Sequence, residues 1–182
     1  MFQYEYTMTD NEYIAFNRHA LRHTPEGKKS VWAFRCVLPL IAVVALLAFW
    51  LAQAAWYLIL AEAIALVILS VVYAIRAEAQ LLKNAEKQLR KAEKKGTSLY
   101  SKAGTIVFDG EGIQDNDGQV DMRLRYAGIH ELHVTQQALY IFLRPMQAIV
   151  LPTHCVGGSA AVEELVEFLQ TVIPAPKIVR VE

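Results

Sequence analysis

Cysteine, proline and glycine are scarce in this chain of 182 residues, which has two, six and nine of them respectively. Cys36 and Cys155 lie far apart and fit no Cys-x-x-Cys or Cys/His spacing, which argues against a zinc ribbon or a thioredoxin-like redox motif. We interpret both as reduced thiols in a reducing compartment. The N-terminus also lacks the charged and apolar regions of a signal peptide, so the first apolar helix has to drive any membrane insertion.

Charge is almost absent from one long stretch of the chain. Across residues 37–75 the only formally charged residue is Glu62, although the chain has 18 basic and 18 acidic residues in all. A bilayer core about 30 Å thick needs roughly 20 helical residues, so the apolar block 31–76 suits two crossings. A buried soluble hairpin is the alternative, but the remaining chain is too short to cover two uniformly apolar helices. The sequence therefore predicts a transmembrane helical hairpin with spans of about 31–51 and 56–76.

The turn of this hairpin is expected at residues 52–55, where polarity and small residues interrupt the apolar run. Trp50, Trp56 and Tyr57 surround it, as aromatic residues do at a membrane–water interface. Lysine and arginine near the spans indicate the orientation, because they favour the cytoplasmic side. None lies in the turn, and we therefore expect both termini in the cytoplasm. Twelve flank the two spans: Arg18, Arg22, Lys28, Lys29, Arg35, Arg76, Lys83, Lys87, Arg90, Lys91, Lys94 and Lys95.

Glu62 is the one ionisable residue within the predicted spans. Such a residue is costly in a membrane helix and is a candidate functional residue by default. One interpretation is that it supports assembly through a hydrogen bond between helices. The alternative is a carboxyl group near the outer interface that snorkels or stays protonated. A single carboxylate without a basic partner does not make a transport pathway.

Residues 1–30 are predicted to form a strand and an amphipathic helix. Aromatic and polar side chains alternate over residues 2–7, which is typical of a strand. Thr9 followed three residues later by Glu12 is a capping box, so a helix should start at about Asp10. This helix packs on the C-terminal domain or lies on the membrane surface. We favour packing, because the strand before it needs a sheet to join.

His19 and His23 lie one turn apart on that helix, a spacing at which two imidazoles can chelate a metal ion. No third ligand is near them in the sequence. We therefore interpret them as part of a solvated basic face, and we predict neither a metal nor another cofactor.

Helical propensity continues beyond the second span without proline or glycine until Gly96, which is well placed to end the helix. Residues 77–96 are thus predicted to be a long cytoplasmic helical extension. Its basic side chains are candidates for binding anionic lipid headgroups, although positive-inside topology explains them equally well. Aromatic residues do not interleave with the charge, so we expect no nucleic-acid binding. The lipid-headgroup candidates are Lys83, Lys87, Arg90, Lys91, Lys94 and Lys95.

Residues 97–182 change to short alternating runs separated by turn residues, which predicts an antiparallel meander. A final amphipathic helix is expected at about Ser159–Val172, with Pro174 after it. The predicted fold class is therefore α+β: a membrane hairpin, its helical extension and a small β domain closed by a helix, similar in size to a pleckstrin-homology-like (PH-like) module. The candidate strands are Leu99–Ala103, Thr105–Phe108, Val120–Tyr126, Ile129–Thr135, Ala138–Leu143 and Ala148–Leu151.

Several short motifs occur in a characteristic order along the chain. They are Glu12–His19 after the aromatic strand, Gly112-Ile113, Tyr126-Ala127-Gly128-Ile129, Leu139–Phe142 and Leu151-Pro152. This order resembles the YcxB-like family of bacterial membrane proteins over nearly the whole chain. Tyr126 stands where that family often has tryptophan, and Thr153-His154 follows where a basic residue is expected. The resemblance implies a PH-like domain tethered to the bacterial inner membrane, with no assigned activity and no catalytic residues to transfer.

Candidate catalytic groups fail on geometry. His130 and His133 are three apart in a predicted strand, so they point to opposite faces. Residues 115–118 resemble a calcium loop but lack its bidentate glutamate, and a hairpin turn explains them better. Adjacent His154 and Cys155 make a poor dyad, because neighbouring side chains rarely face each other and no carboxylate orients them. We predict that the protein is not an enzyme.

Three functions remain open. The first is a membrane-anchored interaction module that binds a protein partner or anionic lipid at the inner membrane face. The second is an immunity protein that neutralises an antibacterial toxin at the membrane. The third is an accessory subunit of a membrane transporter, with Glu62 in a helix–helix contact. In each case the bilayer itself is a partner, and self-association into a homo-oligomer is a further option.

Overall fold

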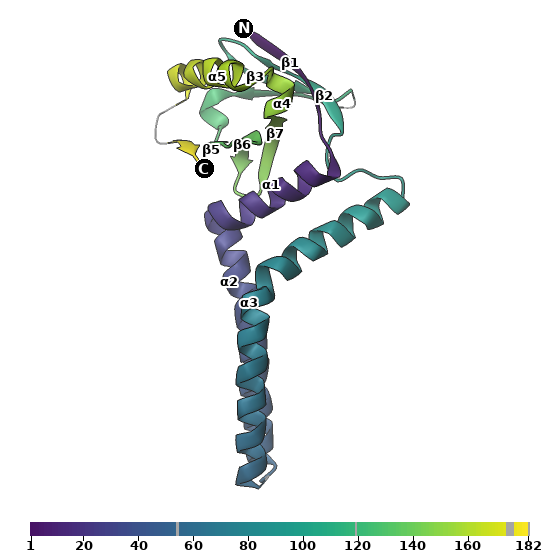
Figure 1. The fold of residues 1–182 in the computed structure, drawn as a ribbon, viewed down its shortest axis with the longest axis vertical. Helices are drawn as coiled ribbons and strands as arrows, with labels where there is room; N and C mark the ends of the chain where they lie inside the picture. Colours follow the sequence, from purple (N-terminus) through teal and green to yellow (C-terminus); the bar gives the residue numbers. More distant parts are fainter. Residues whose placement is uncertain (54, 119, 174–176, 182) are drawn as a thin grey trace.

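The computed structural model describes residues 1–53, 55–118, 120–173 and 177–181. A long helical hairpin projects from a domain of two β-sheets and flanking helices (Figure 1). Both chain termini lie at the domain end, and the turn of the hairpin lies at the far end (Figure 1). The first and last segments of the chain therefore belong to the domain, and the hairpin is inserted between them.

The hairpin consists of α2 (Pro25–Leu51) and α3 (Trp56–Lys94), so the predicted turn at residues 52–55 is confirmed, with Ala54 outside the described residues. Helix α2 begins six residues before the predicted span of about 31–51, which lies wholly within it. Thr24 caps it by accepting a hydrogen bond from the amide of Gly27, and the proline at the first position suits a helix start.

The apolar parts of both helices are almost entirely unburied within the protein. Each helix is long and apolar enough to cross a membrane, and the most apolar window is 6% buried in α2 and 0% buried in α3. Large side chains such as Leu40, Trp56 and Ile75 project outward along the hairpin. We call residues 31–76 the apolar hairpin.

Helix α3 continues unbroken past the apolar hairpin to Lys94, as the sequence predicts, and Gly96 has the positive φ of 69° that suits a helix end. This last section leans away from α2 and runs beneath the domain (Figure 1). Leu82, Leu89 and Ala92 are buried along it.

The first sheet has the order β1-β2-β3-β4 and is antiparallel throughout: β1 (Phe2–Thr7), β2 (Ala103–Phe108), β3 (Gly112–Asn116) and β4 (Asp121–Arg125). The strand predicted at Leu99–Ala103 is wrong, since β2 begins only at Ala103. Strand β3 was missed, because three of its five residues are polar and its Gly112-Ile113 pair suggests a turn.

The second sheet has the order β7-β6-β5-β8: β5 (Glu131–Val134), β6 (Ala138–Arg144), β7 (Gln147–Pro152) and β8 (Ile178–Arg180). A 3-10 turn, η1 (Tyr126–Gly128), leads into it, and the short helix α4 (Thr153–Val156) follows it. Helix α5 (Ser159–Val172) has the predicted bounds. The expected all-antiparallel arrangement is wrong at β8, which pairs parallel with β5.

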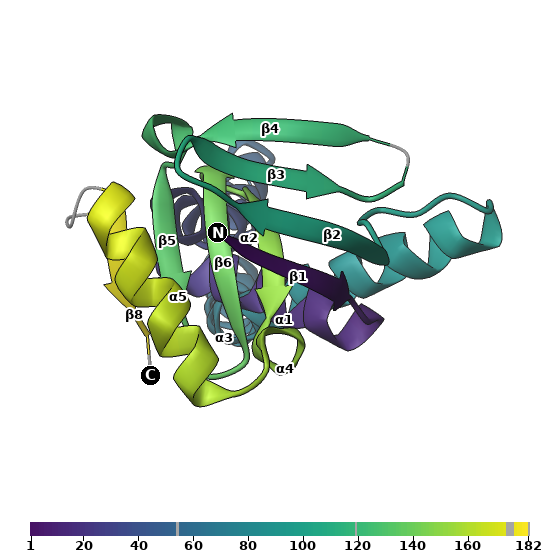
Figure 2. The same cartoon turned by 90° about the horizontal axis from the view of Figure 1, so that it is seen from above.

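Strands of the first sheet run across those of the second, with α5 along one side (Figure 2). The main core lies between the sheets and α5, and includes Phe108, Leu139, Ile141 and Leu165. A second core lies on the other face of β6, where Tyr140, Phe142 and their neighbours pack against α1 (Asp10–His23). The first five residues of β6 are all buried. Since successive side chains point to opposite sides of a sheet, both faces of this strand are covered.

Candidate functional site

The corner between α1 and α2 fixes how the apolar hairpin leaves the domain. Thr24 is 1% exposed; its hydroxyl donates to the carbonyl of Ala20 at 2.7 Å and accepts from the amide of Gly27 at 3.0 Å. A Cβ on Gly27 would lie 2.1 Å from the oxygen of Ala20 and 2.6 Å from the Cα of Leu21. Only glycine permits this approach, so the corner is a close backbone contact between two helices.

A groove opens beside this corner, where α1, α2 and α3 meet. It has a volume of about 500 Å³. Four positions of α2 recur at i, i+3, i+4 and i+7, which places them on one helix face. We call it the basic groove; its lining residues are Leu21, Arg22, Lys28, Lys29, Val31, Trp32, Arg35 and Glu78.

Positive charge dominates the basic groove. Arg22 on α1 forms an ion pair with Glu78 on α3, with Nε and Oε1 2.6 Å apart. Lys28, Lys29 and Arg35 have no acidic partner within the described part of the chain. Three uncompensated cations therefore surround a small hollow, a charge pattern that suits a phosphate-bearing anion.

Trp32 gives the groove an apolar wall as well as charge. Its side chain is 69% exposed, although tryptophan is among the residues that gain most from burial. It stands at the start of the apolar hairpin, one turn from Lys28 and Arg35. An exposed indole beside ammonium and guanidinium groups is the combination found where membrane proteins meet lipid headgroups.

The lipid-headgroup candidates predicted on α3 lie elsewhere. Their side chains are exposed along the last section of that helix, and within the described residues none of them lines the basic groove. They are Lys83, Lys87, Arg90, Lys91, Lys94 and Lys95. Sequence reasoning counted Lys28, Lys29 and Arg35 as topology signals and missed the site that they form. Their heptad-like spacing with Trp32 was the available signal.

Glu62 lies in the half of the apolar hairpin's second helix that is nearest the turn, and it is partly exposed. Its carboxylate has no hydrogen-bond or ion-pair partner among residues 1–53, 55–118, 120–173 and 177–181. A role for Glu62 in assembly stays a prediction.

A histidine network holds α1 to the second sheet. Nε2 of His19 lies 2.8 Å from Nδ1 of His133 on β5, and Nε2 of His133 lies 2.9 Å from a carboxylate oxygen of Glu131. The ring of His19 also stacks on Tyr140 and on His23, with centroids 4.5 and 4.6 Å apart. The interpretation of His19 as part of a solvated face is therefore wrong. It lies one turn from Phe16 on the buried stripe, and that spacing would have revealed it.

Burial and neighbouring positive charge both favour the neutral forms of His19 and His23. Burial first, and then the nearby imidazoles of His133 and His23, lower the pKa of His19 to about 4. Burial likewise lowers the pKa of His23. Nε2 of His133 is within hydrogen-bond distance of Glu131, and a single proton lies between Nδ1 of that ring and Nε2 of His19. In the described residues no group of three His, Cys, Asp or Glu is arranged to hold a metal ion.

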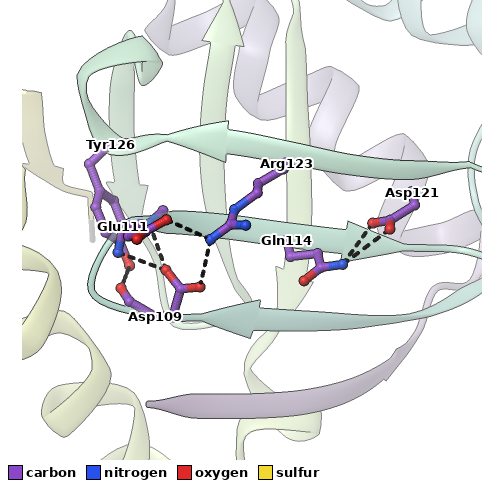
Figure 3. Close-up of polar contacts among 7 residues, drawn as sticks. Asp109, Glu111, Gln114, Asp121, Arg123 and Tyr126 are labelled. Carbon is purple, nitrogen blue, oxygen red and sulfur yellow. Dashed lines mark hydrogen bonds and ion pairs between the residues drawn. The ribbon is translucent and has the colours of Figure 1, made fainter.

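A third polar cluster supports the turn between β2 and β3 (Figure 3). Asp109 accepts backbone hydrogen bonds from Glu111 and Gly112 at 2.7 and 2.8 Å, and these bonds lower its pKa. Arg123 bridges Glu111 and Asp109 from β4, and the hydroxyl of Tyr126 donates to the Asp109 carbonyl. These carboxylates are engaged in shaping the hairpin, so the cluster explains local structure rather than ligand binding.

Comparison of the chain with protein-family models, with curated proteins and with solved structures finds no match. The resemblance to the YcxB-like family therefore stays a prediction. The basis for a functional conclusion is the arrangement itself: an unburied apolar hairpin, a basic groove at its root and a domain fixed beside both.

Proposed function

We propose that this is a two-span membrane protein whose cytoplasmic α+β domain is a PH-like interaction module, seated on anionic lipid headgroups through the basic groove. The proposal depends on two features that lie side by side, a cluster of unpaired basic side chains and an exposed apolar surface. The groove with its unpaired Lys28, Lys29 and Arg35 lies at the root of a helical pair whose apolar surface is bare. A bacterial inner membrane, rich in anionic lipid on its cytoplasmic face, supplies partners for both surfaces.

Burial supports a membrane setting for the apolar hairpin. A core helix of a soluble protein is mostly buried, whereas these apolar windows are 6% and 0% buried. Full burial of one large aliphatic side chain is worth about 1.5–3 kcal/mol, so this surface is unfavourable in water and suited to lipid. Strand β1 and helix α1 precede the hairpin and pack with the domain that follows it, so the hairpin is joined to the folded domain on both sides.

Orientation is supported by charge and by architecture. Lysine and arginine flank the domain end of the hairpin and are missing from its turn, as expected when the domain end is cytoplasmic. Both termini lie at that same end (Figure 1). A two-span topology with both termini inside accounts for both observations.

The form of the domain supports the PH-like part of the proposal. Two four-stranded sheets cross each other, and a helix after the last antiparallel strand covers one side (Figure 2). PH-like modules use this plan to display loops and edges for binding, and the YcxB-like resemblance points to the same plan. The corner at Gly27 would hold such a module at a set distance from the headgroups.

Lipid titration of the detergent-solubilised full chain tests the groove. The triple variant Lys28→Gln, Lys29→Gln and Arg35→Gln should lose affinity for phosphatidylglycerol, measured by native mass spectrometry. Near an anionic surface each basic residue contributes about 1 kcal/mol, so the loss approaches a factor on the order of 100.

The matched control is the triple variant Lys87→Gln, Lys91→Gln and Lys94→Gln, which removes the same charge from α3 outside the groove. It should retain most of the lipid affinity. Equal losses in the two variants would show that net charge, rather than the groove, attracts the lipid, and would refute the assignment of this site.

A further inference from the structure

The last described strand, β8, is the chain's own C-terminal tail laid along an open sheet edge. It has three residues, follows α5 and pairs parallel with β5 in the register Leu132↔Ile178. The amide of Val181 extends the ladder by donating to the carbonyl of Val134 at 3.0 Å. Without this segment, β5 would be an uncovered edge strand of the second sheet.

The described part of the tail is held by its ladder, by Ile178 packed against the main core and by two polar side chains. Nζ of Lys177 donates to the carbonyl of Ile129 at 2.6 Å, and the guanidinium of Arg180 meets the carboxylate of Glu163 on α5 at 2.9 and 3.2 Å. Both side chains of the ion pair are more than half exposed, and exposed pairs contribute little stability. Val179 is also exposed. The ladder of this strand covers only three residues, and parallel pairing is slightly less stable per residue than antiparallel pairing.

The tail fills only part of the space between β5 and α5. A cavity of about 500 Å³ lies against its end, and its lining includes Val134, Thr135, Val162, Glu163 and Val181. The lining thus combines aliphatic side chains with Glu163, whose carboxylate meets Arg180. We call the tail's seat and this cavity together the tail groove.

We propose that the tail groove is a binding site for an extended peptide segment of a partner protein, with a basic residue for Glu163 and aliphatic residues at alternate positions. The chain's own tail shows this chemistry, because Arg180 meets Glu163 while Ile178 aligns with the buried Leu132. Strand addition to a sheet edge supplies the backbone hydrogen bonds, and the side-chain pockets supply selectivity. The tail groove is separate from the basic groove. Its ligand is a protein segment, whereas the ligand of the basic groove is a lipid headgroup.

Competition with the tail provides the test. The double variant Ile178→Ser and Arg180→Glu, in the full chain in nanodiscs, weakens both the apolar and the charged contact of β8. A fluorescent synthetic peptide with the sequence of residues 177–181 should bind this release variant at least tenfold tighter than it binds the unaltered chain. The tethered tail is present at a millimolar effective concentration and excludes the peptide until it is released.

Charge reversal tests the assigned chemistry. Glu163→Arg is added to a release variant with Arg180→Gln in place of Arg180→Glu, so that the tail cannot pair with the new arginine. This change should abolish peptide binding, and a peptide with glutamate in place of its arginine should restore it. Glu167→Arg, at an exposed position one turn further along α5, is the matched control and should leave binding unchanged. Each variant is first compared by thermal unfolding, and Arg180→Glu alone replaces the double variant if that one fails to fold.

Two results would overturn the proposal. One is a folded release variant that binds no peptide, or that binds both peptides equally. The other is a dimer of the unaltered chain, detected by mass photometry, that disappears in the release variant. That dimer would assign the tail groove to the tail of a second copy rather than to a partner protein.

Discussion

The apolar hairpin and the α+β domain contain similar side chains but use them in opposite ways. In the domain Phe142 is 1% exposed and lies between β6 and α1, whereas in the hairpin Phe49 is 41% exposed. The domain hides its apolar surface within itself, and the hairpin presents its apolar surface outward. Hydropathy alone does not separate these cases; the amount of remaining chain that can cover a helix does. The predictions that follow test this contrast.

The largest expected effect comes from truncating the same residue type in the two regions. Phe142→Ala should destabilise the domain by about 3–5 kcal/mol, because it opens a cavity in a closed core. Phe49→Ala should change the free energy of unfolding of the domain by less than about 1 kcal/mol. Denaturant titration of both variants in detergent measures this difference. Similar losses would mean that the apolar hairpin has a packed interior of its own.

The joint between the regions should be the next most sensitive point. Gly27→Ala should destabilise the protein by about 1–3 kcal/mol, because its methyl group would overlap the backbone of Ala20 and force α1 from α2. Gly110→Ala is the control, since a Cβ there meets nothing within 4 Å. Thermal unfolding compares the two. A tolerated Gly27→Ala would show that the corner opens freely.

Acid should loosen the domain through α1. The pKa of His19 is about 4 in the folded protein and near 6.5 when unfolded, so between these values the unfolded chain binds more protons. Stability is therefore fully present above about pH 6.5 and declines as the pH falls toward 4. Melting temperatures across this range should fall less steeply in His19→Gln. An unchanged slope in that variant would assign the acid sensitivity to other groups.

The smallest effect is expected within the apolar hairpin. Glu62→Gln keeps the shape of the side chain and removes its charge, and the carboxylate has no partner among the described residues. The oligomeric mass in detergent should therefore stay the same. A change of mass would establish Glu62 as an assembly residue, with a contact to another chain.

The elements that sequence predicts best are those whose signals are local. The capping box at Thr9 and Glu12 marks the start of α1, and both of its hydrogen bonds form. The apolar hairpin and its turn follow from segregation of charge, and α5 follows from its apolar stripe. Each of these depends on residues within a few turns of one another.

The elements that sequence missed depend on distant partners. The sequence of strand β3 is typical of a polar turn, and only its pairing with β2 and β4 makes it a strand. Strand β8 has too few residues for a periodic signal. The basic groove requires three helices to converge, and its Arg22 and Glu78 are far apart in the sequence. The partner of His19 comes from β5. Local periodicity identifies the faces of helices and strands but not what they meet.

The pairing of β1 with β2 imposes an order of events during synthesis. Phe2 lies opposite Phe108, so the first strand of the domain waits for a strand that is made only after the whole hairpin. At about 5–20 residues per second, this interval is on the order of ten seconds. The domain is thus of high contact order across the hairpin, and its first sheet closes only when the hairpin has come back. If synthesis stalls halfway through the hairpin, the aromatic strand β1 has no partner. Unpaired strand edges of this kind are prone to aggregation and are bound by chaperones.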